Sequence, residues 1–251
     1  MPSEEEWRRF LTRFHEARPA ITERLLDRAD TSPYAWLVEP LRRVDGPVVD
    51  LACGSAPTRD ELTAADWVGV DSSPAELAGA AARGRGPLVL GDATALPFAT
   101  GAVGAVCAAM SLQVLPRLDT VLAEVTRVLR PGGTIAALTP ARLWPSLTGM
   151  LTWARVLRVS GLPRPAWPNP RACDTVGRVL EAHGLTVTSN RRHVFVLRME
   201  TPADTSLLVD SLYLPGVDEE RLRSAQRALA PWAHPGRGLA LPLRRVVAHR
   251  S

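Results

Sequence analysis

Apolar residues recur at two different spacings along this chain of 251 residues. In the middle of the chain, short continuous apolar runs alternate with segments in which apolar residues recur every three or four positions, as in amphipathic helices. The runs predict strands at residues 48–51, 67–70, 88–90, 103–109 and 134–138. The periodic segments predict helices at residues 57–62, 73–83 and 118–129. Apolar strands that alternate with helices indicate a mostly parallel sheet covered on both faces.

The flanks complete this pattern. Helical spacing predicts two helices within residues 4–28, interrupted at Pro19. Further helices are expected at 33–41, 145–160, 172–183, 203–213 and 218–230, and further strands at 185–197 and 238–247. We therefore expect an α/β fold, Rossmann-like, with a seven-stranded mostly parallel sheet and helices on both faces. An N-terminal helical lid (1–45), a core (46–140) and substrate-side helices with the last strands (141–251) would form one structural domain, with a helical insertion late in the sheet.

Composition adds little evidence of a charged partner. All 30 basic residues are arginine, and the formal net charge is only +4. Arginine pairs are scattered along the sequence, at Arg8-Arg9, Arg42-Arg43, Arg191-Arg192 and Arg244-Arg245. A nucleic-acid footprint needs a concentrated basic patch. We therefore interpret these pairs as solvated faces and substrate-side charges, and expect no nucleic-acid partner.

Other features indicate a cytoplasmic protein. Cys53, Cys107 and Cys173 lack metal-ligand spacing, so no metal site is expected, and three free thiols suit a reducing compartment. The acidic N-terminus lacks the apolar run of a signal peptide. The most apolar stretch, residues 143–162, contains Arg155 and Arg158 and is predicted to be an amphipathic helix instead of a membrane span. A monomer or homodimer is expected.

Polar chemistry gathers where the predicted strands end. Asp50 to Ala56 is a loop of small residues between a strand and a helix, and it lets a ligand approach backbone N–H groups. Asp71 ends the next strand, where a carboxylate can accept hydrogen bonds from both ribose hydroxyls. Gly91-Asp92-Ala93 follows the third strand, where a carboxylate can accept from an adenine amine. One sheet edge would thus bind the amino acid, ribose and base of a nucleoside-like ligand.

This ordered set, with the downstream runs 111–116 and 121–133, resembles the class I S-adenosylmethionine-dependent methyltransferases. The resemblance is to the branch typified by ubiquinone/menaquinone-biosynthesis methyltransferases and many natural-product tailoring enzymes, and it covers residues 46–140. It implies S-adenosyl-L-methionine as cofactor, bound by the core. It also implies that Asp50 lies near the ligand's amino group and that Ala52 and Gly54 lie under its methionine part. By the same resemblance Asp71, with Ser72 beside it, binds ribose; Asp92 and Ala93 contact adenine; and Met110 and Ser111 lie beside the sulfonium.

The chain departs from the family pattern in this first loop. Alanine stands at positions 52 and 56, where relatives usually have glycine, and Pro57 follows. Ala56 and Pro57 place a methyl group and a rigid ring where the methionine carboxylate normally lies. The departure implies a shifted ligand or, as the alternative, altered or lost activity.

The flanks provide candidates for the acceptor side. Aromatic and methionine residues there are expected either to wall an apolar pocket or to be ordinary core residues: Trp7, Phe10, Phe14, Tyr34, Trp36, Trp144, Met150, Trp153 and Trp167. His15 on the lid is the first candidate for a general base and Tyr34 the second. The alternative role of Tyr34 is binding of the ligand's carboxylate.

Three functions remain open at this point. The leading hypothesis is in-line methyl transfer to a small-molecule acceptor, in particular a specialised metabolite of a bacterium. The second is S-adenosylmethionine chemistry without methylation, by transfer or cyclisation of the aminocarboxypropyl arm. The third is an RNA methyltransferase or a non-catalytic S-adenosylmethionine-binding module. A dinucleotide-binding protein would need later glycines that the loop after Gly54 lacks.

Overall fold

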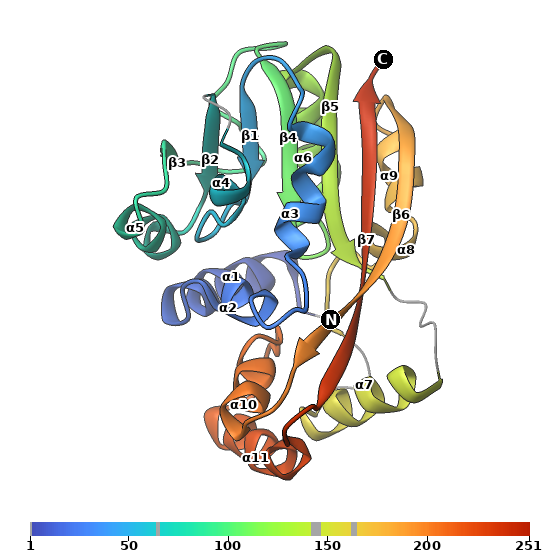
Figure 1. Ribbon diagram of the computed structural model, residues 1–251. Helices are drawn as coiled ribbons and strands as arrows, with labels where there is room; N and C mark the ends of the chain where they lie inside the picture. The colour runs from blue at the N-terminus through green and yellow to red at the C-terminus, as the bar shows by residue number, and fades with distance from the viewer. Residues whose placement is uncertain (1, 64–65, 142–146, 162–164) are drawn as a thin grey trace.

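The computed structural model describes residues 2–63, 66–141, 147–161 and 165–251, and its centre is one seven-stranded sheet (Figure 1). The strand order is β3-β2-β1-β4-β5-β7-β6. β1 to β5 run parallel, and β7 runs antiparallel to both β5 and β6. The expected Rossmann-like, mostly parallel seven-stranded sheet is therefore confirmed.

Each predicted strand and helix has a counterpart in the structure. The strands are β1 (Val48–Leu51), β2 (Trp67–Asp71), β3 (Leu88–Leu90), β4 (Val103–Ala109), β5 (Leu129–Pro140), β6 (Leu185–Arg198) and β7 (Gly238–Arg250). The helices before β5 are α1 (Glu4–Ala17), α2 (Ile21–Leu26), α3 (Pro33–Val38), the 3-10 turn η1 (Glu39–Leu41), α4 (Thr58–Glu61), α5 (Pro74–Ala82) and α6 (Leu118–Val128). Those after it are α7 (Leu147–Val159), α8 (Arg171–Asp174), α9 (Val176–Glu181), α10 (Pro202–Asp210), α11 (Glu219–Leu229) and η2 (Ala230–Trp232).

Two boundaries differ from the prediction for local reasons. β5 begins at Leu129, which pairs with Val103, and the pairing then shifts to Ala105 and Thr134 across the Pro-Gly-Gly segment. Gly133 allows this irregularity, since a Cβ there would lie 2.8 Å from the Arg130 carbonyl oxygen. The helix predicted at 172–183 is divided at Thr175, whose φ of −109° and ψ of 16° leave the helical region.

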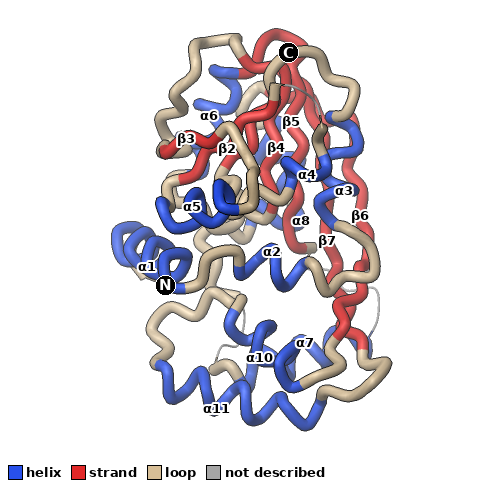
Figure 2. The backbone as a smooth tube through the Cα atoms, turned by 60° about the vertical axis from the view of Figure 1, so that its left-hand side comes forward, coloured by secondary structure: helices blue, strands red, loops and turns tan. Residues whose placement is uncertain are grey.

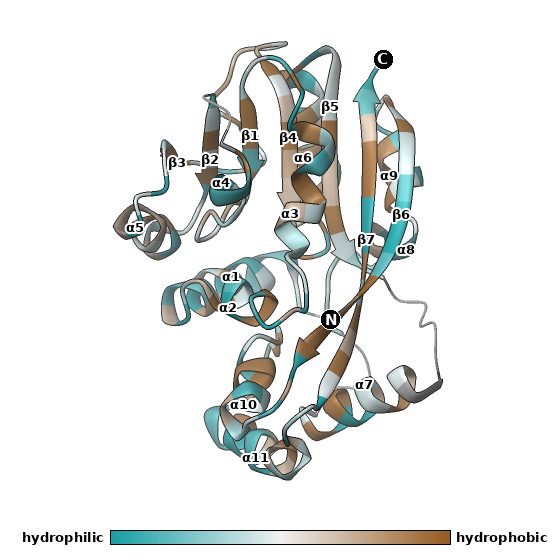
Figure 3. Cartoon of the chain, in the orientation of Figure 1, coloured by the Kyte–Doolittle hydropathy of each residue, from teal (hydrophilic) through white to brown (hydrophobic). Residues whose placement is uncertain are grey.

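The two faces of the sheet bury separate apolar cores. α6, α8 and α9 cover one face, where Val106, Ile135 and Ala137 lie fully buried. α3, α5 and α7 contribute to the core of the other face, with Cys107, Ala136 and Leu138. β6 and β7 continue beyond the parallel strands, and α7, α10 and α11 gather around that extension (Figures 1 and 2). Figure 3 shows the corresponding hydrophobic colouring of the parallel strands.

α1 and α2 lie across the carboxyl ends of the parallel strands, between the sheet and α10 (Figures 1 and 2). A capping box of Ser3 and Glu6 begins α1. The apolar side of this lid packs against α10 through Phe14, Ile21 and Leu207. The late helical insertion therefore supports the lid, although the two are far apart in the sequence.

The antiparallel pairing of β6 with β7 also changes the picture of the arginine pairs. Arg191 is opposite Arg245 and Arg192 is opposite Arg244. The prediction that the basic pairs are scattered is thus wrong for two of the four, because strand pairing joins residues that are more than fifty positions apart. Among the described residues, no helix has the length and apolar character needed to span a membrane.

Candidate functional site

A cavity of about 650 Å³ lies between the lid and the carboxyl ends of the strands. The loops that follow β1, β2, β3 and β4 all contribute to its wall. In an open α/β sheet, the strand ends at a reversal of strand order are the usual ligand site. Ten predicted site residues line this cavity: His15, Tyr34, Ala52, Gly54, Asp71, Ser72, Asp92, Ala93, Met110 and Ser111. Contact of each with a ligand stays a prediction.

The loop after β1 follows an unusual backbone path. Ala52, Gly54 and Ala56 have positive φ values of 54°, 54° and 58°. Glycine adopts this region without strain, whereas alanine there is disfavoured because its Cβ approaches backbone oxygen. The family's preference for glycine at these positions thus has a conformational explanation, and the alanines retain the left-handed conformation here. Ala56 is fully buried under the loop and does not line the cavity.

Asp50 lies behind this loop and does not line the cavity. Its side chain is buried and accepts a hydrogen bond from the Thr58 hydroxyl. Trp67 Nε1 donates to the same hydroxyl at 3.2 Å. Burial raises the pKa of Asp50 to about 7, while hydrogen bonds from Thr58 and Cys107 act in the opposite direction. The structure thus gives Asp50 an anchoring role, and its predicted contact with the ligand's amino group is untested.

Asp71 connects two of the cavity loops. Its carboxylate accepts from the backbone N–H of Gly54 at 2.7 Å and from that of Ser73 at 2.8 Å. Burial raises the pKa of Asp71, and these two backbone donors oppose that rise. A carboxylate has about four acceptor positions, so two remain for a ligand after these bonds. Asp71 therefore fixes the loops and can still accept hydrogen bonds from a diol.

The loops after β3 and β4 provide the other predicted positions. Asp92 Oδ1 accepts from the N–H and the hydroxyl of Thr94, each at 2.8 Å, which holds its carboxylate at the cavity wall. Met110 has a φ of +57° and donates its N–H to the carbonyl of Leu138. This left-handed residue ends β4 and turns the chain towards Ser111.

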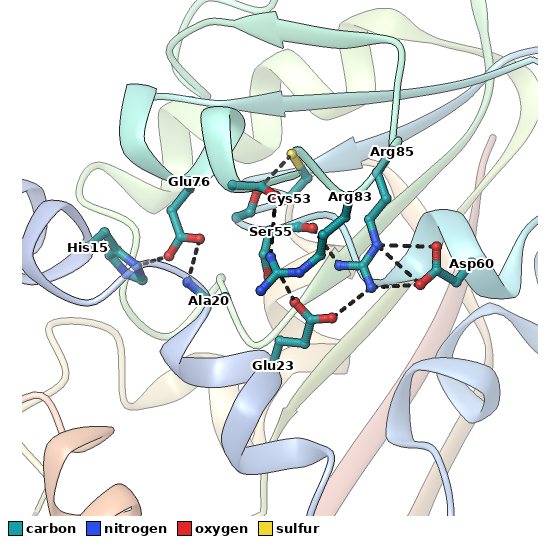
Figure 4. A network of polar contacts seen from close by, with 11 residues as sticks. His15, Ala20, Glu23, Cys53, Ser55, Asp60, Glu76, Arg83 and Arg85 are labelled. Atoms are coloured by element: carbon teal, nitrogen blue, oxygen red, sulfur yellow. Dashed lines mark hydrogen bonds and ion pairs between the residues drawn. The ribbon is translucent and has the colours of Figure 1, made fainter. Parts of the chain in front are cut away.

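Glu76 ties the lid to the sheet edge, as Figure 4 shows. It is 3% exposed, and its carboxylate accepts from the backbone N–H of Ala20 and pairs with His15 Nδ1, both at 2.8 Å. The other ring nitrogen of His15 lies 3.2 Å from the Tyr213 hydroxyl. Glu76 and Tyr213 also line the cavity. With Nδ1 donating to Glu76, the neutral ring leaves Nε2 as an acceptor for the tyrosine.

A second connection between lid and sheet involves Glu23 and Arg85. Arg85 pairs with Glu23 at 2.7 Å and with Asp60 at 2.6 Å, and it donates to the carbonyl of Ser55 at 2.7 Å (Figure 4). No pattern in the sequence pointed to Glu76, Tyr213 or the Glu23–Arg85 group as part of the site. Of these residues, only Glu76 stands at a position that a sequence motif marks, three residues after the helix cap Ser73, as in a capping box. Its side chain does not complete that motif and instead accepts from the backbone N–H of Ala20 in the lid.

The aromatic residues of the flanks do not form the expected pocket wall. Of the described members of that set, only Tyr34 lines the cavity. Trp7 Nε1 donates to the carbonyl of Val114, Phe14 is buried beneath the lid, and Trp153 Nε1 donates to the carbonyl of Ala240. Trp144 lies outside the described residues. The α1 face that lines the cavity is largely polar, and it includes Arg8, Arg9, Thr12, His15 and Glu16.

The environment of Tyr34 bears on its predicted roles. The side chain is buried, and burial raises the pKa of Tyr34 well above its usual value, with the charge of Glu23 adding to the rise. A phenol that resists ionisation is a poor general base. Tyr34 is therefore better suited to donate a hydrogen bond. No cluster of potential metal ligands occurs in the part of the chain that the structure describes.

Known proteins resemble this chain most clearly in its central segment. Residues 49–137 match a family model described as a methyltransferase domain. A demethylmenaquinone methyltransferase from Mycolicibacterium paratuberculosis is 43% identical over 90 residues, which are 35% of this chain and 39% of that protein. The chain thus matches about two fifths of the length of this curated relative.

Solved structures share the fold along more of the chain. An S-adenosylmethionine-dependent methyltransferase from Thermotoga maritima superposes with a TM-score of 0.60 and 16% identity, covering 96% of this chain and 99% of that one. Geranyl diphosphate C-methyltransferase from Streptomyces coelicolor, solved with S-adenosyl-L-homocysteine, gives a TM-score of 0.50 and 15% identity, covering 86% of this chain and 77% of that one. Residues 49–137 thus match a methyltransferase domain, and the chain has the fold of S-adenosylmethionine-dependent methyltransferases, in agreement with the expected family.

Proposed function

We propose that this protein is an S-adenosylmethionine-dependent methyltransferase that transfers the methyl group in line to a small-molecule acceptor. The observation that carries the proposal is the cavity in which four strand-end loops present Gly54, Asp71, Asp92 and Met110 under one lid. Its volume of about 650 Å³ lies within the range of roughly 300–1,000 Å³ that small-molecule sites occupy.

The covering of the cavity supports a small acceptor. α1 and α2 lie across the strand ends and are held there by Glu76 and Arg85, both of which make hydrogen bonds to the lid. A lid that excludes water favours methyl transfer, because a sulfonium needs a well-aligned nucleophile more than it needs strong catalytic groups. The relatives with printed acceptors, a menaquinone precursor and geranyl diphosphate, act on small molecules, which supports the same class.

His15 is the group that we propose as the base for an acceptor that must lose a proton. Glu76 orients the ring, and Nε2 and the Tyr213 hydroxyl are both on the cavity side of the lid. A proton from the acceptor would pass to Nε2, either directly or through the Tyr213 hydroxyl, which gives its own proton to His15 as it receives another. Tyr213 is partly buried, and its desolvation raises the pKa of its phenol, which keeps it protonated between turnovers.

Calorimetric titration with S-adenosylmethionine tests the binding part of the proposal. We expect saturable binding at one site, weakened by Asp71→Asn but not by Glu219→Gln, which alters an exposed carboxylate on α11. Absence of binding in the wild type would remove the basis of the proposal.

Product analysis tests the chemistry. With a panel of small hydroxylated and amine acceptors, S-adenosylhomocysteine and a methylated acceptor are expected. Methylthioadenosine as the product would instead establish transfer or cyclisation of the aminocarboxypropyl arm.

A further inference from the structure

A second concave surface lies on the face of β6 and β7 next to α3 and η1, and we call it the arginine cleft. It encloses about 660 Å³ and shares no lining residue with the cavity under the lid. Among its described lining residues, one acidic side chain, Glu39, accompanies a basic set: Arg42, Arg43, Arg191, Arg245 and His249.

Strand register explains how this charge accumulates. Arg191 of β6 is directly opposite Arg245 of β7, and alternate residues of a strand share one face. Arg42 and Arg43 follow η1, which brings them to the same cleft. Like charges directly opposite each other in a sheet are destabilising. The arrangement therefore opposes folding unless an anion compensates it.

Among the described lining residues, the protein provides one carboxylate, Glu39, for the four arginines of the cleft. Arg245 is 6% exposed; it pairs with Glu39 at 2.7 Å, donates to the backbone carbonyl of Trp36, and its guanidinium lies 4.8 Å from the ring centre of Trp36. Its Nε is buried without a hydrogen-bond partner among the described residues. Arg42 lies 3.9 Å from Glu61. Within the same described part of the chain, Arg43 and Arg191 form no ion pair.

We propose that the arginine cleft binds a phosphate-bearing polyanion. A guanidinium group can bind two phosphate oxygens at once through its paired N–H donors. Several arginines around one cleft therefore favour phosphate over anions that lack this geometry. Thr188 and Ser189 add hydroxyl groups to the same wall. Arg42 and Arg43 follow η1 and Arg191 comes from β6, so the guanidinium groups that line the cleft come from different elements.

Titration calorimetry with inorganic triphosphate tests this site directly. The wild type should bind one triphosphate per chain. The double variant Arg43→Ala/Arg191→Ala should bind roughly tenfold more weakly or worse, because each lost guanidinium removes charged hydrogen bonds. The matched control is Arg223→Ala/Arg227→Ala, which removes the same charge from exposed positions on α11 and should retain wild-type affinity.

The source of the phosphate is decided by competition. Displacement of triphosphate by a short single-stranded RNA at lower concentration would identify a phosphodiester backbone, whereas triphosphate binding without such displacement would identify a free oligophosphate. Either result supports the phosphate site. The proposal fails if the wild type binds neither probe saturably, or if both double variants weaken binding equally, since net charge would then explain the attraction.

Discussion

Replacing Asp50 by asparagine should change how the stability of this protein depends on pH. Asp50 is buried behind the loop after β1, and its Oδ1 has no hydrogen-bond partner among the described residues. Burial raises the pKa of Asp50 from 3.8 to about 7. Between these values the unfolded chain loses this proton while the folded chain keeps it. The folded state then binds more protons, so the free energy of unfolding falls as pH rises.

The size of this effect follows from the pKa difference. About three pKa units correspond to about 4 kcal/mol, at 1.36 kcal/mol per unit, and the loss is complete above pH about 7. Below pH 3.8 the carboxyl group is protonated in both states and contributes no difference. Asparagine cannot ionise, but its oxygen can still accept from Thr58. The stability of Asp50→Asn relative to wild type should therefore increase by up to about 4 kcal/mol between pH 4 and pH 8.

Urea denaturation of both proteins across this pH range measures the difference, and comparison at each pH cancels the titration of all other groups. Glu219→Gln is the control, because it removes a carboxylate whose side chain is 81% exposed. Profiles for wild type and Asp50→Asn that run parallel from pH 4 to pH 8 would refute the reasoning and show that Asp50 ionises normally in the fold.

Three further changes test the cavity and its lid. Asp71→Asn should weaken S-adenosylmethionine binding by roughly 1.5–3 kcal/mol per lost charged hydrogen bond, and unchanged calorimetric affinity would contradict the assignment of this residue to the ribose. In thermal melts, Ala56→Gly should keep the free energy of unfolding within about 1 kcal/mol of wild type, because glycine relieves the positive φ while the buried methyl group is lost. The control is Ala137→Gly in β5, which loses a buried methyl group without such relief and should be clearly destabilising. Tyr213→Phe retains the ring packed 4.7 Å from Phe14 and should lower kcat by about tenfold or more with little change in KM; an unchanged kcat would remove the hydroxyl from the proton path.

The sequence alone predicted the parallel part of the sheet and the edge at which the cavity lies. The apolar runs that form β1 to β4 are short and continuous, Asp71 is the last residue of β2, and Asp92 comes two residues after the end of β3. Parallel strands bring their carboxyl ends to one edge. Local order in the chain was therefore sufficient to place residues from four loops around one cavity. The sequence also predicted where α3 and α5 begin, because the caps Ser32 and Ser73 each accept a hydrogen bond from the backbone of the helix turn that follows them.

Tertiary structure decided everything that depends on which elements meet. Trp7 and Phe14 have the spacing of a helix face, but only tertiary packing determined that Phe14 is buried against α10 and that Trp7 bonds to the carbonyl of Val114. The same packing turns a polar face of α1 to the cavity. The partners of His15 come from α5 and from the segment after α10. These contacts join residues 61 and 198 positions apart, a separation at which sequence periodicity carries no information.

The arginine pairs show most clearly the difference between what the sequence predicts and what the tertiary structure decides. Composition and spacing describe them as separate, because a sequence records neighbours along the chain and not across a sheet. The register of β6 and β7 places Arg191 opposite Arg245, and η1 brings Arg43 to the same cleft. Charge density is a property of distance in space, so only the folded chain could turn scattered arginines into a site.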